Sequence, residues 1–162
     1  MAKACLITSA LVLLGAHGFE NIGGLEPCPL CMNQRGIHWL GIWGGFAVLF
    51  GTSKLPNIPA WLFVAALALI YLSSAGVAGY HAGVEWKWWP GPQGCSGGAS
   101  LEGLTAEELM KSITQASGVP RCDEISWSLF GLSMAGYNFL ISLALSALAL
   151  LGLRSEMQKA NS

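Results

Sequence analysis

The chain has 162 residues, of which 53% are hydrophobic and only 10% are charged. Soluble domains usually carry about 25% charged residues, so this composition excludes an ordinary soluble domain and is typical of a membrane protein. The net charge of −1, without any run of basic residues, gives no indication of nucleic-acid binding.

Four stretches of the sequence lack Asp, Glu, Lys and Arg, and a membrane-spanning helix needs roughly 20 mainly apolar residues. These stretches cover residues 4–19, 36–53, 55–84 and 125–153. The first has an alternative interpretation, because Lys3 followed by an apolar run also resembles a signal peptide. The cleavage pattern of small residues that such a peptide needs is poor in this stretch.

We therefore predict an all-α membrane protein with a single domain over residues 1–162, built as a bundle of four transmembrane helices. The helices are expected at about 4–24, 33–53, 60–81 and 126–153, with outer loops at about 25–32 and 82–125.

The orientation follows from Lys and Arg in the short loops, which favour the cytoplasmic side. One side of the predicted bundle carries Lys3, Lys54, Arg154 and Lys159. The basic residues of the long second loop weigh less, because long loops are translocated largely regardless of charge. We therefore expect both termini in the cytoplasm and both cysteine-containing loops on the outer side, which for a bacterial inner membrane would be the periplasm.

The long second outer loop holds most of the polar residues. It begins with Trp86, Trp88 and Trp89, which suit the aromatic belt at a membrane surface. Further on, the run from Thr105 to Glu108 is a capping box, which predicts a short helix that ends before Pro120. This helix would either lie on the membrane surface or pack on the bundle.

A Cys-x-x-Cys motif, Cys28 and Cys31, precedes the second predicted helix, and Arg35 follows one turn later. A thiol at a helix N-terminus beside a guanidinium has a lowered pKa and is partly thiolate. A structural zinc site usually needs a second close pair of ligands, and a disulfide within the motif would close too short a loop to stabilise much. These points favour redox exchange, with no metal.

The other cysteines allow more than one interpretation. Cys95 and Cys122 could form a disulfide that only stabilises the loop. Alternatively, the Gly-rich surroundings of Cys95 would leave its sulfur accessible to the thiolate of another protein, which exchange requires. Cys5 is expected to be a small buried or lipid-facing residue near the cytoplasmic end.

The polar residues near the predicted spans also have alternative roles. Arg35 either extends to the lipid headgroups or stabilises an anion near the Cys-x-x-Cys motif. His81 ends the third span and is a candidate to carry a proton near a cofactor. We expect His17 and His38 to be hydrogen-bonded packing residues, and Asn138 to make a hydrogen bond between helices.

With these motifs together, the sequence resembles the disulfide bond formation protein B (DsbB) family of membrane thiol:quinone oxidoreductases. The resemblance covers nearly the whole chain, including the four spans and the lone cysteine pair in the second outer loop. Its motifs are Cys28-Pro29-Leu30-Cys31 with Gln34-Arg35, Tyr80-His81 with Glu85, Cys122-Asp123-Glu124, Trp127, Phe130-Gly131-Leu132-Ser133-Met134 and Asn138.

The resemblance implies an electron relay. A periplasmic DsbA-like thiol oxidase would be reoxidised by attacking a Cys95–Cys122 disulfide at Cys95, and Cys122 would pass the electrons on through Cys28. Cys31 would then donate to ubiquinone or menaquinone, with Arg35 and His81 at the cofactor.

Two other functions remain open. A quinone-coupled thiol reductase like those of the vitamin K epoxide reductase family has a similar four-helix core, but that family carries its Cys-x-x-Cys late in the chain. A non-enzymatic membrane scaffold with a structural loop disulfide is the third possibility.

Overall fold

Four long helices and one small hairpin make up the part of the chain that the computed structural model describes, which is residues 1–92, 95, 105, 107, 110 and 120–161. The helices are α1 (Ala2–Asn21), α2 (Pro29–Lys54), α3 (Ala60–Glu85) and α5 (Met134–Ala160). Strands β1 (Ser128–Leu129) and β2 (Leu132–Ser133) pair antiparallel directly before α5.

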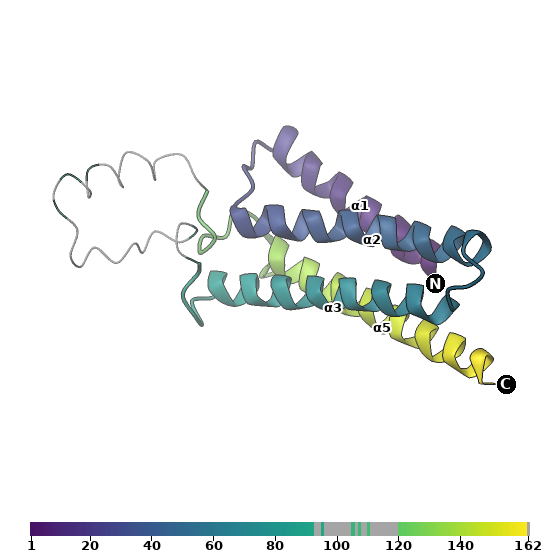
Figure 1. Cartoon of the computed structure of the whole chain (residues 1–162). Coiled ribbons are helices and arrows are strands. Elements are labelled where there is room, and N and C mark those ends of the chain that lie inside the picture. The colour runs from purple at the N-terminus through teal and green to yellow at the C-terminus, as the bar shows by residue number, and fades with distance from the viewer. Residues whose placement is uncertain (93–94, 96–104, 106, 108–109, 111–119, 162) are drawn as a thin grey trace.

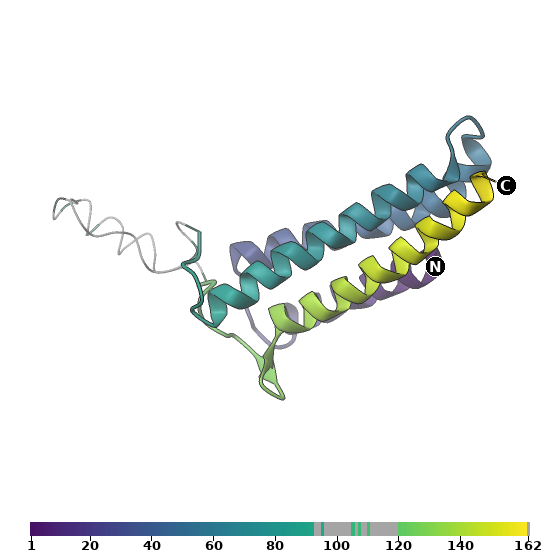
Figure 2. The same cartoon turned by 90° about the horizontal axis from the view of Figure 1, so that it is seen from below.

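The four helices run alongside one another as a bundle (Figures 1 and 2). Both termini and the α2–α3 connection lie at one end, and the α1–α2 connection and the hairpin lie at the other. Helix α3 packs most extensively on α5, and α2 packs on both α1 and α3. The first and second cysteine-containing segments are thereby brought to the same end of the bundle.

Small side chains let α3 and α5 approach closely, as is common between helices in membranes. The buried residues on the facing sides of the two helices include Ala75, Ala78, Ala135 and Ala149. The hydroxyl groups of Ser74 and Ser142 lie 2.8 Å apart and form a hydrogen bond across this contact.

Helices α1, α3 and α5 are each long and apolar enough to cross a membrane, judged by length and composition. Their most apolar windows have mean hydropathies of 1.5, 2.0 and 1.8, respectively. Helix α2 has a similar length but carries Arg35 and His38 among its apolar residues. The prediction of a helical protein is confirmed, and three of its helices can cross a membrane by length and composition.

The predicted helix boundaries are wrong in several places. The last helix begins at Met134 and not near residue 126, because β1 and β2 form a hairpin first. Phe130 and Gly131 occupy the turn with φ of 50° and 79°, the left-handed geometry that a two-residue hairpin loop requires. Ser133 then caps α5, and its Oγ accepts a hydrogen bond from the Gly136 amide at 3.1 Å.

The other helices also differ from their predicted limits. Helix α2 begins at Pro29, because proline suits the first helical position and the preceding cysteine caps the helix. Helix α3 continues to Glu85, and α1 ends at Asn21. The short helix predicted after Thr105 falls mostly outside the described residues.

Candidate redox site

The Cys-x-x-Cys pair forms the N-terminus of α2. Cys28 is the N-cap residue, and its sulfur accepts a hydrogen bond from the Cys31 amide at 3.3 Å. The Cys28 thiol in turn donates to the Cys31 sulfur, with the two Sγ atoms 2.9 Å apart. Both residues are free cysteines, so this is the reduced form of the pair.

The two thiols differ strongly in acidity. Both precede the charge-free stretch 36–53 and lie outside the part of α2 that would cross a membrane. The hydrogen bond from the Cys28 thiol lowers the pKa of Cys31 to about 7, although burial opposes this. The pKa of Cys28 is raised, because its proton is held in that hydrogen bond and the residue is buried. Cys31 is therefore the more acidic thiol of the pair.

The second cysteine pair lies against the first. Cys95 and Cys122 form a disulfide, and the Cys122 amide donates to the Cys95 carbonyl oxygen at 2.5 Å. Both residues pack with Cys28 in one buried cluster that also contains Leu30 and Val84. The expectation that Cys95 is accessible is wrong for this structure, since only 4% of its surface is exposed. Packing on the end of the bundle buries it despite the Gly-rich sequence around it.

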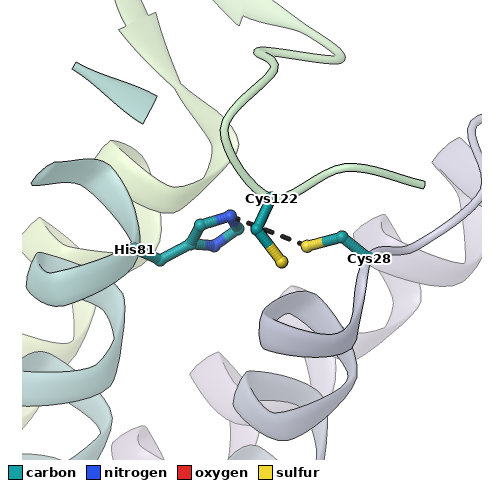
Figure 3. A group of neighbouring side chains, drawn as sticks. All are labelled: Cys28, His81 and Cys122. Carbon is teal, nitrogen blue, oxygen red and sulfur yellow. Dashed lines mark hydrogen bonds between the residues drawn. The ribbon is translucent and has the colours of Figure 1, made fainter. Parts of the chain in front are cut away.

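Cys28, His81 and Cys122 approach one another from three different segments, namely the start of α2, the end of α3 and the connection before β1 (Figure 3). Their Sγ and ring nitrogen atoms all lie within 4.8 Å of one another. The His81 Nε2 lies 3.6 Å from the Cys28 Sγ. Such a group also matches the spacing of metal ligands, but the Cys122 sulfur is in a disulfide here and is no thiolate ligand.

Asp123 fixes the segment that carries Cys122. The Lys87 Nζ lies 2.7 Å from Asp123 Oδ2, and Arg121 contacts both carboxylate oxygens at 3.0 and 2.9 Å. These hydrogen bonds, first from Arg121 and then from Lys87, lower the pKa of Asp123. Lys87 directly follows the C-cap residue of α3, so the clamp ties Cys122 to the helix end that also carries His81.

Arg35 differs from the expected arrangement. Its guanidinium forms an ion pair with Glu20 of α1 and donates from Nη2 to the Ala16 carbonyl oxygen at 3.1 Å. Its charge lowers the pKa of Cys31, but less than the Cys28 hydrogen bond does. The side chain is only 13% exposed, because it lies against α1. Sequence reasoning missed Glu20, although a lone carboxylate at the end of an apolar span was a signal for a partner.

A cavity of about 370 Å³ lies beside the motif, and both Cys28 and Cys31 line it. Its apolar wall comes mainly from α1 and α5 and includes Leu13, Phe19, Met134 and Ile141. Cys31 and Arg35 line it from α2, and His81 lines it from α3. The cavity therefore combines an apolar lining with a few polar groups beside a reactive sulfur, which is typical of a small-molecule site.

The remaining polar predictions have mixed outcomes. Asn138 and His38 are buried and hydrogen-bonded to each other across helices at 2.7 Å, as predicted. Cys5 is buried, also as predicted. The prediction for His17 is wrong, since its side chain is 51% exposed and lies 3.7 Å from Glu20. The role of Gln34, which bonds to His81 and Asn138, was missed.

Comparisons with known proteins identify the family of the chain. The family model described as disulfide bond formation protein DsbB matches residues 1–152. A disulfide bond formation protein B of Psychrobacter sp. (strain PRwf-1) is 35% identical over 152 residues, which cover 90% of this chain and 85% of the relative.

Another disulfide bond formation protein B, from Verminephrobacter eiseniae (strain EF01-2), is 32% identical over 165 residues, which cover 96% of this chain and 89% of the relative. No solved structure matches the chain. The family prediction is confirmed: the chain belongs to the disulfide bond formation protein DsbB family and is a disulfide oxidoreductase.

Proposed function

We propose that this protein reoxidises a periplasmic DsbA-like dithiol oxidase and passes the two electrons to a membrane quinone, either ubiquinone or menaquinone. One observation carries the proposal: the Cys-x-x-Cys pair adjoins both the second cysteine pair and the cavity. The Cys28 Sγ lies within 4.8 Å of the Cys122 Sγ, and Cys28 and Cys31 both line the cavity, with Cys31 the more acidic of the two. A relay needs this placement, because electrons must enter the pair from the second cysteine pair and leave it toward an acceptor in the cavity.

The first exchange takes two electrons from the partner. A partner thiolate attacks the Cys95 sulfur, the Cys95–Cys122 bond breaks, and Cys122 leaves as a thiolate. The second partner thiolate then attacks the mixed disulfide, which oxidises the partner and releases Cys95 as a thiolate. Since Cys95 is 4% exposed, its segment must move before a partner can reach the sulfur.

The second exchange passes the electrons inward. The Cys122 thiolate attacks Cys28 in a Cys28–Cys31 disulfide, and Cys31 leaves as a thiolate. The Cys95 thiolate next attacks Cys122, which restores the Cys95–Cys122 disulfide and releases Cys28. The product has one disulfide and a reduced Cys-x-x-Cys pair, and this is the combination found in the structure.

The cavity residues suit a quinone ring. The apolar walls would pack on its faces, and Arg35 and His81 would supply polar contacts at its edge. When bound, a quinone supplies an acceptor for two electrons and two protons. Cys31 would be the residue that faces it, because its pKa of about 7 makes it substantially ionised at neutral pH.

We further propose that all four long helices cross the inner membrane, with both termini in the cytoplasm and the cysteines at the periplasmic face. Helix α2 lies alongside the three helices that are apolar enough to span (Figure 1). Its exposed residues include Trp39, Leu40, Trp43, Phe46 and Phe50, which suit contact with lipid. The positions of Lys3, Lys54, Arg154 and Lys159 support the orientation.

The test is quinol formation by the purified full-length protein with a short-chain ubiquinone and a reduced DsbA-type protein. We expect catalytic turnover that is lost in Cys28→Ser and in Cys31→Ser. Cys5→Ser is the matched control, since Cys5 is a free cysteine buried away from the motif, and it should retain activity. No quinol formation by the wild-type protein with either ubiquinone or menaquinone would refute the proposal.

A further inference from the structure

A chain of buried polar side chains runs from the redox site into the bundle. The Gln34 Nε2 lies 2.8 Å from the His81 Nδ1, and the Asn138 Nδ2 donates to the Gln34 Oε1 at 2.6 Å. The Asn138 Oδ1 lies 2.7 Å from the His38 Nε2. All four residues are at least 90% buried, with exposures of 6% for Gln34, 2% for His81, 8% for Asn138 and 1% for His38.

The direction of each hydrogen bond follows from the chemistry of the groups. An amide nitrogen only donates, so the Gln34 Nε2 requires an unprotonated Nδ1 on His81. A neutral imidazole then carries its proton on Nε2. That nitrogen points toward the Cys28 Sγ at 3.6 Å and also lies 3.9 Å from the Glu85 Oε1. His81 therefore presents an N–H group toward the Cys28 sulfur, with the Cys122 backbone as a second hydrogen-bond partner of the ring.

The side chains at the other end of this row, Asn138 and His38, also have further hydrogen-bond partners. The Asn138 Oδ1 only accepts, and it takes hydrogen bonds from the His38 Nε2 and from the Ser142 hydroxyl at 3.3 Å. The His38 Nδ1 lies 3.2 Å from the Ser9 Oγ, which lies 2.8 Å from the Tyr71 hydroxyl. The Tyr71 hydroxyl also donates to the Cys5 carbonyl oxygen at 3.1 Å.

We propose that Asn138 and His38 are positioning residues that act through Gln34 and hold His81 in the tautomer with its proton on Nε2, facing the Cys28 sulfur. The two residues contact neither cysteine. A buried amide is costly to leave without partners, so each member constrains the orientation of the next.

The consequence for exchange rests on the proposed function. When the Cys95 thiolate attacks Cys122 in a Cys28–Cys122 mixed disulfide, Cys28 leaves with the electron pair of the broken bond. An N–H donor near that sulfur stabilises the thiolate, and a better-stabilised thiolate leaves faster. In the opposite tautomer, the Nε2 lone pair would face the departing negative charge and oppose this step.

Nitrogen NMR of the full-length protein in detergent micelles tests the tautomer directly, without a partner or a quinone. The chain has only three histidines, so labelling with ¹⁵N-histidine gives few signals, and His81→Gln identifies those of His81. Protonated and unprotonated ring nitrogens have widely separated ¹⁵N shifts. We expect His81 to carry its proton on Nε2 in the wild-type protein; a proton on Nδ1 would overturn the proposal, whether or not the enzyme turns over.

Asn138→Asp tests the action at a distance. An ionised aspartate only accepts, so the Gln34 amide must reverse to donate to it, and the Gln34 oxygen then faces the His81 Nδ1. We expect the His81 proton to move from Nε2 to Nδ1, two hydrogen bonds away from the substitution. An unchanged His81 tautomer in a folded Asn138→Asp protein would refute the proposal.

The matched control is Ser146→Ala, also in α5. The Ser146 hydroxyl donates to the Leu143 carbonyl oxygen, and it is not one of the buried side chains that link His38 to His81. This substitution should leave the His81 tautomer unchanged, and a tautomer change there would argue against a specific path. Should Asn138→Asp fail to fold, His38→Leu replaces it, because leucine removes the donor to the Asn138 Oδ1. Retention of a single Nε2–H signal for His81 in that variant would equally refute the role of His38.

Discussion

Replacing Cys28 with alanine removes the thiol that donates to the Cys31 sulfur at 2.9 Å, which is the main cause of the lowered pKa of Cys31. Without it, the pKa of Cys31 should rise from about 7 toward the ordinary cysteine value of about 8.5. This shift of about 1.5 units corresponds to about 2 kcal/mol. Cys28→Ser is the matched variant, because a hydroxyl at the same position retains a donor.

The assay is the pH dependence of alkylation in a Cys5→Ser background, where Cys31 is the remaining free thiol. At pH 6 the shift lowers the thiolate fraction of Cys31 roughly 30-fold. The more basic thiolate is intrinsically about fivefold more nucleophilic, which offsets part of the loss. We therefore expect Cys28→Ala to react about sixfold more slowly than Cys28→Ser at pH 6, with its midpoint at higher pH.

Equal midpoints for the alanine and serine variants would refute the reasoning, because the hydrogen bond would then have no effect on acidity. Arg35→Gln extends the comparison. Its charge is the smaller influence on Cys31, so this substitution should raise the midpoint less than Cys28→Ala does. A larger rise would show that the guanidinium, despite its ion pair with Glu20, dominates the thiolate.

Two further predictions concern stability. Gly41→Ala should reduce the free energy of unfolding by about 1–3 kcal/mol, because its methyl group would lie 2.9 Å from the Tyr71 hydroxyl, and thermal unfolding should show a lower midpoint. Gly76→Ala is the control and should cause no such loss, because its methyl group would meet nothing within 4 Å. Hydrogen bonds, chiefly from Arg121, lower the pKa of Asp123 in the folded protein. The Asp123 carboxylate should therefore contribute its full stabilisation above the ordinary aspartate pKa of about 3.9, and that contribution should be lost as the pH falls through the lowered pKa of the folded protein. Thermal unfolding between neutral and acidic pH should therefore depend less on pH in Asp123→Asn than in the wild-type protein, and equal dependence would contradict the clamp.

The sequence predicted the helices because their signal is local. Stretches without charges are long enough to identify each helix, whatever it packs against. The start of α5 was missed because Ser128–Gly131 is as free of charge as the helix that follows, so the pattern could not reveal a hairpin. That hairpin depends on two consecutive residues with positive φ, and Phe130 is a residue type that does not signal this conformation.

The site was predictable where spacing determines it and unpredictable where packing does. The spacing of Cys28 and Cys31 predicts a thiol of lowered pKa at a helix start, and in the structure both residues lie at the start of α2 with the pKa of Cys31 lowered. The burial of Cys95 depends instead on contacts with the distant ends of α2 and α3. The Arg35–Glu20 pair likewise joins two helices, and no local pattern in α2 identifies its partner.

The Cys-x-x-Cys spacing has a structural reason that links the helix start to the chemistry. An N-cap side chain accepts a hydrogen bond from the amide three residues later, which is the separation of Cys28 and Cys31. Capping therefore brings the Cys28 sulfur close to the Cys31 backbone amide. In this position the Cys28 thiol can donate its proton in a hydrogen bond to the Cys31 sulfur. The backbone amides in the first turn of a helix have no partners within the helix. For this reason the first turn needs a cap, and it also favours a negative charge on Cys31. A single geometric requirement, that of starting a helix, thus places both thiols and makes the second the more acidic.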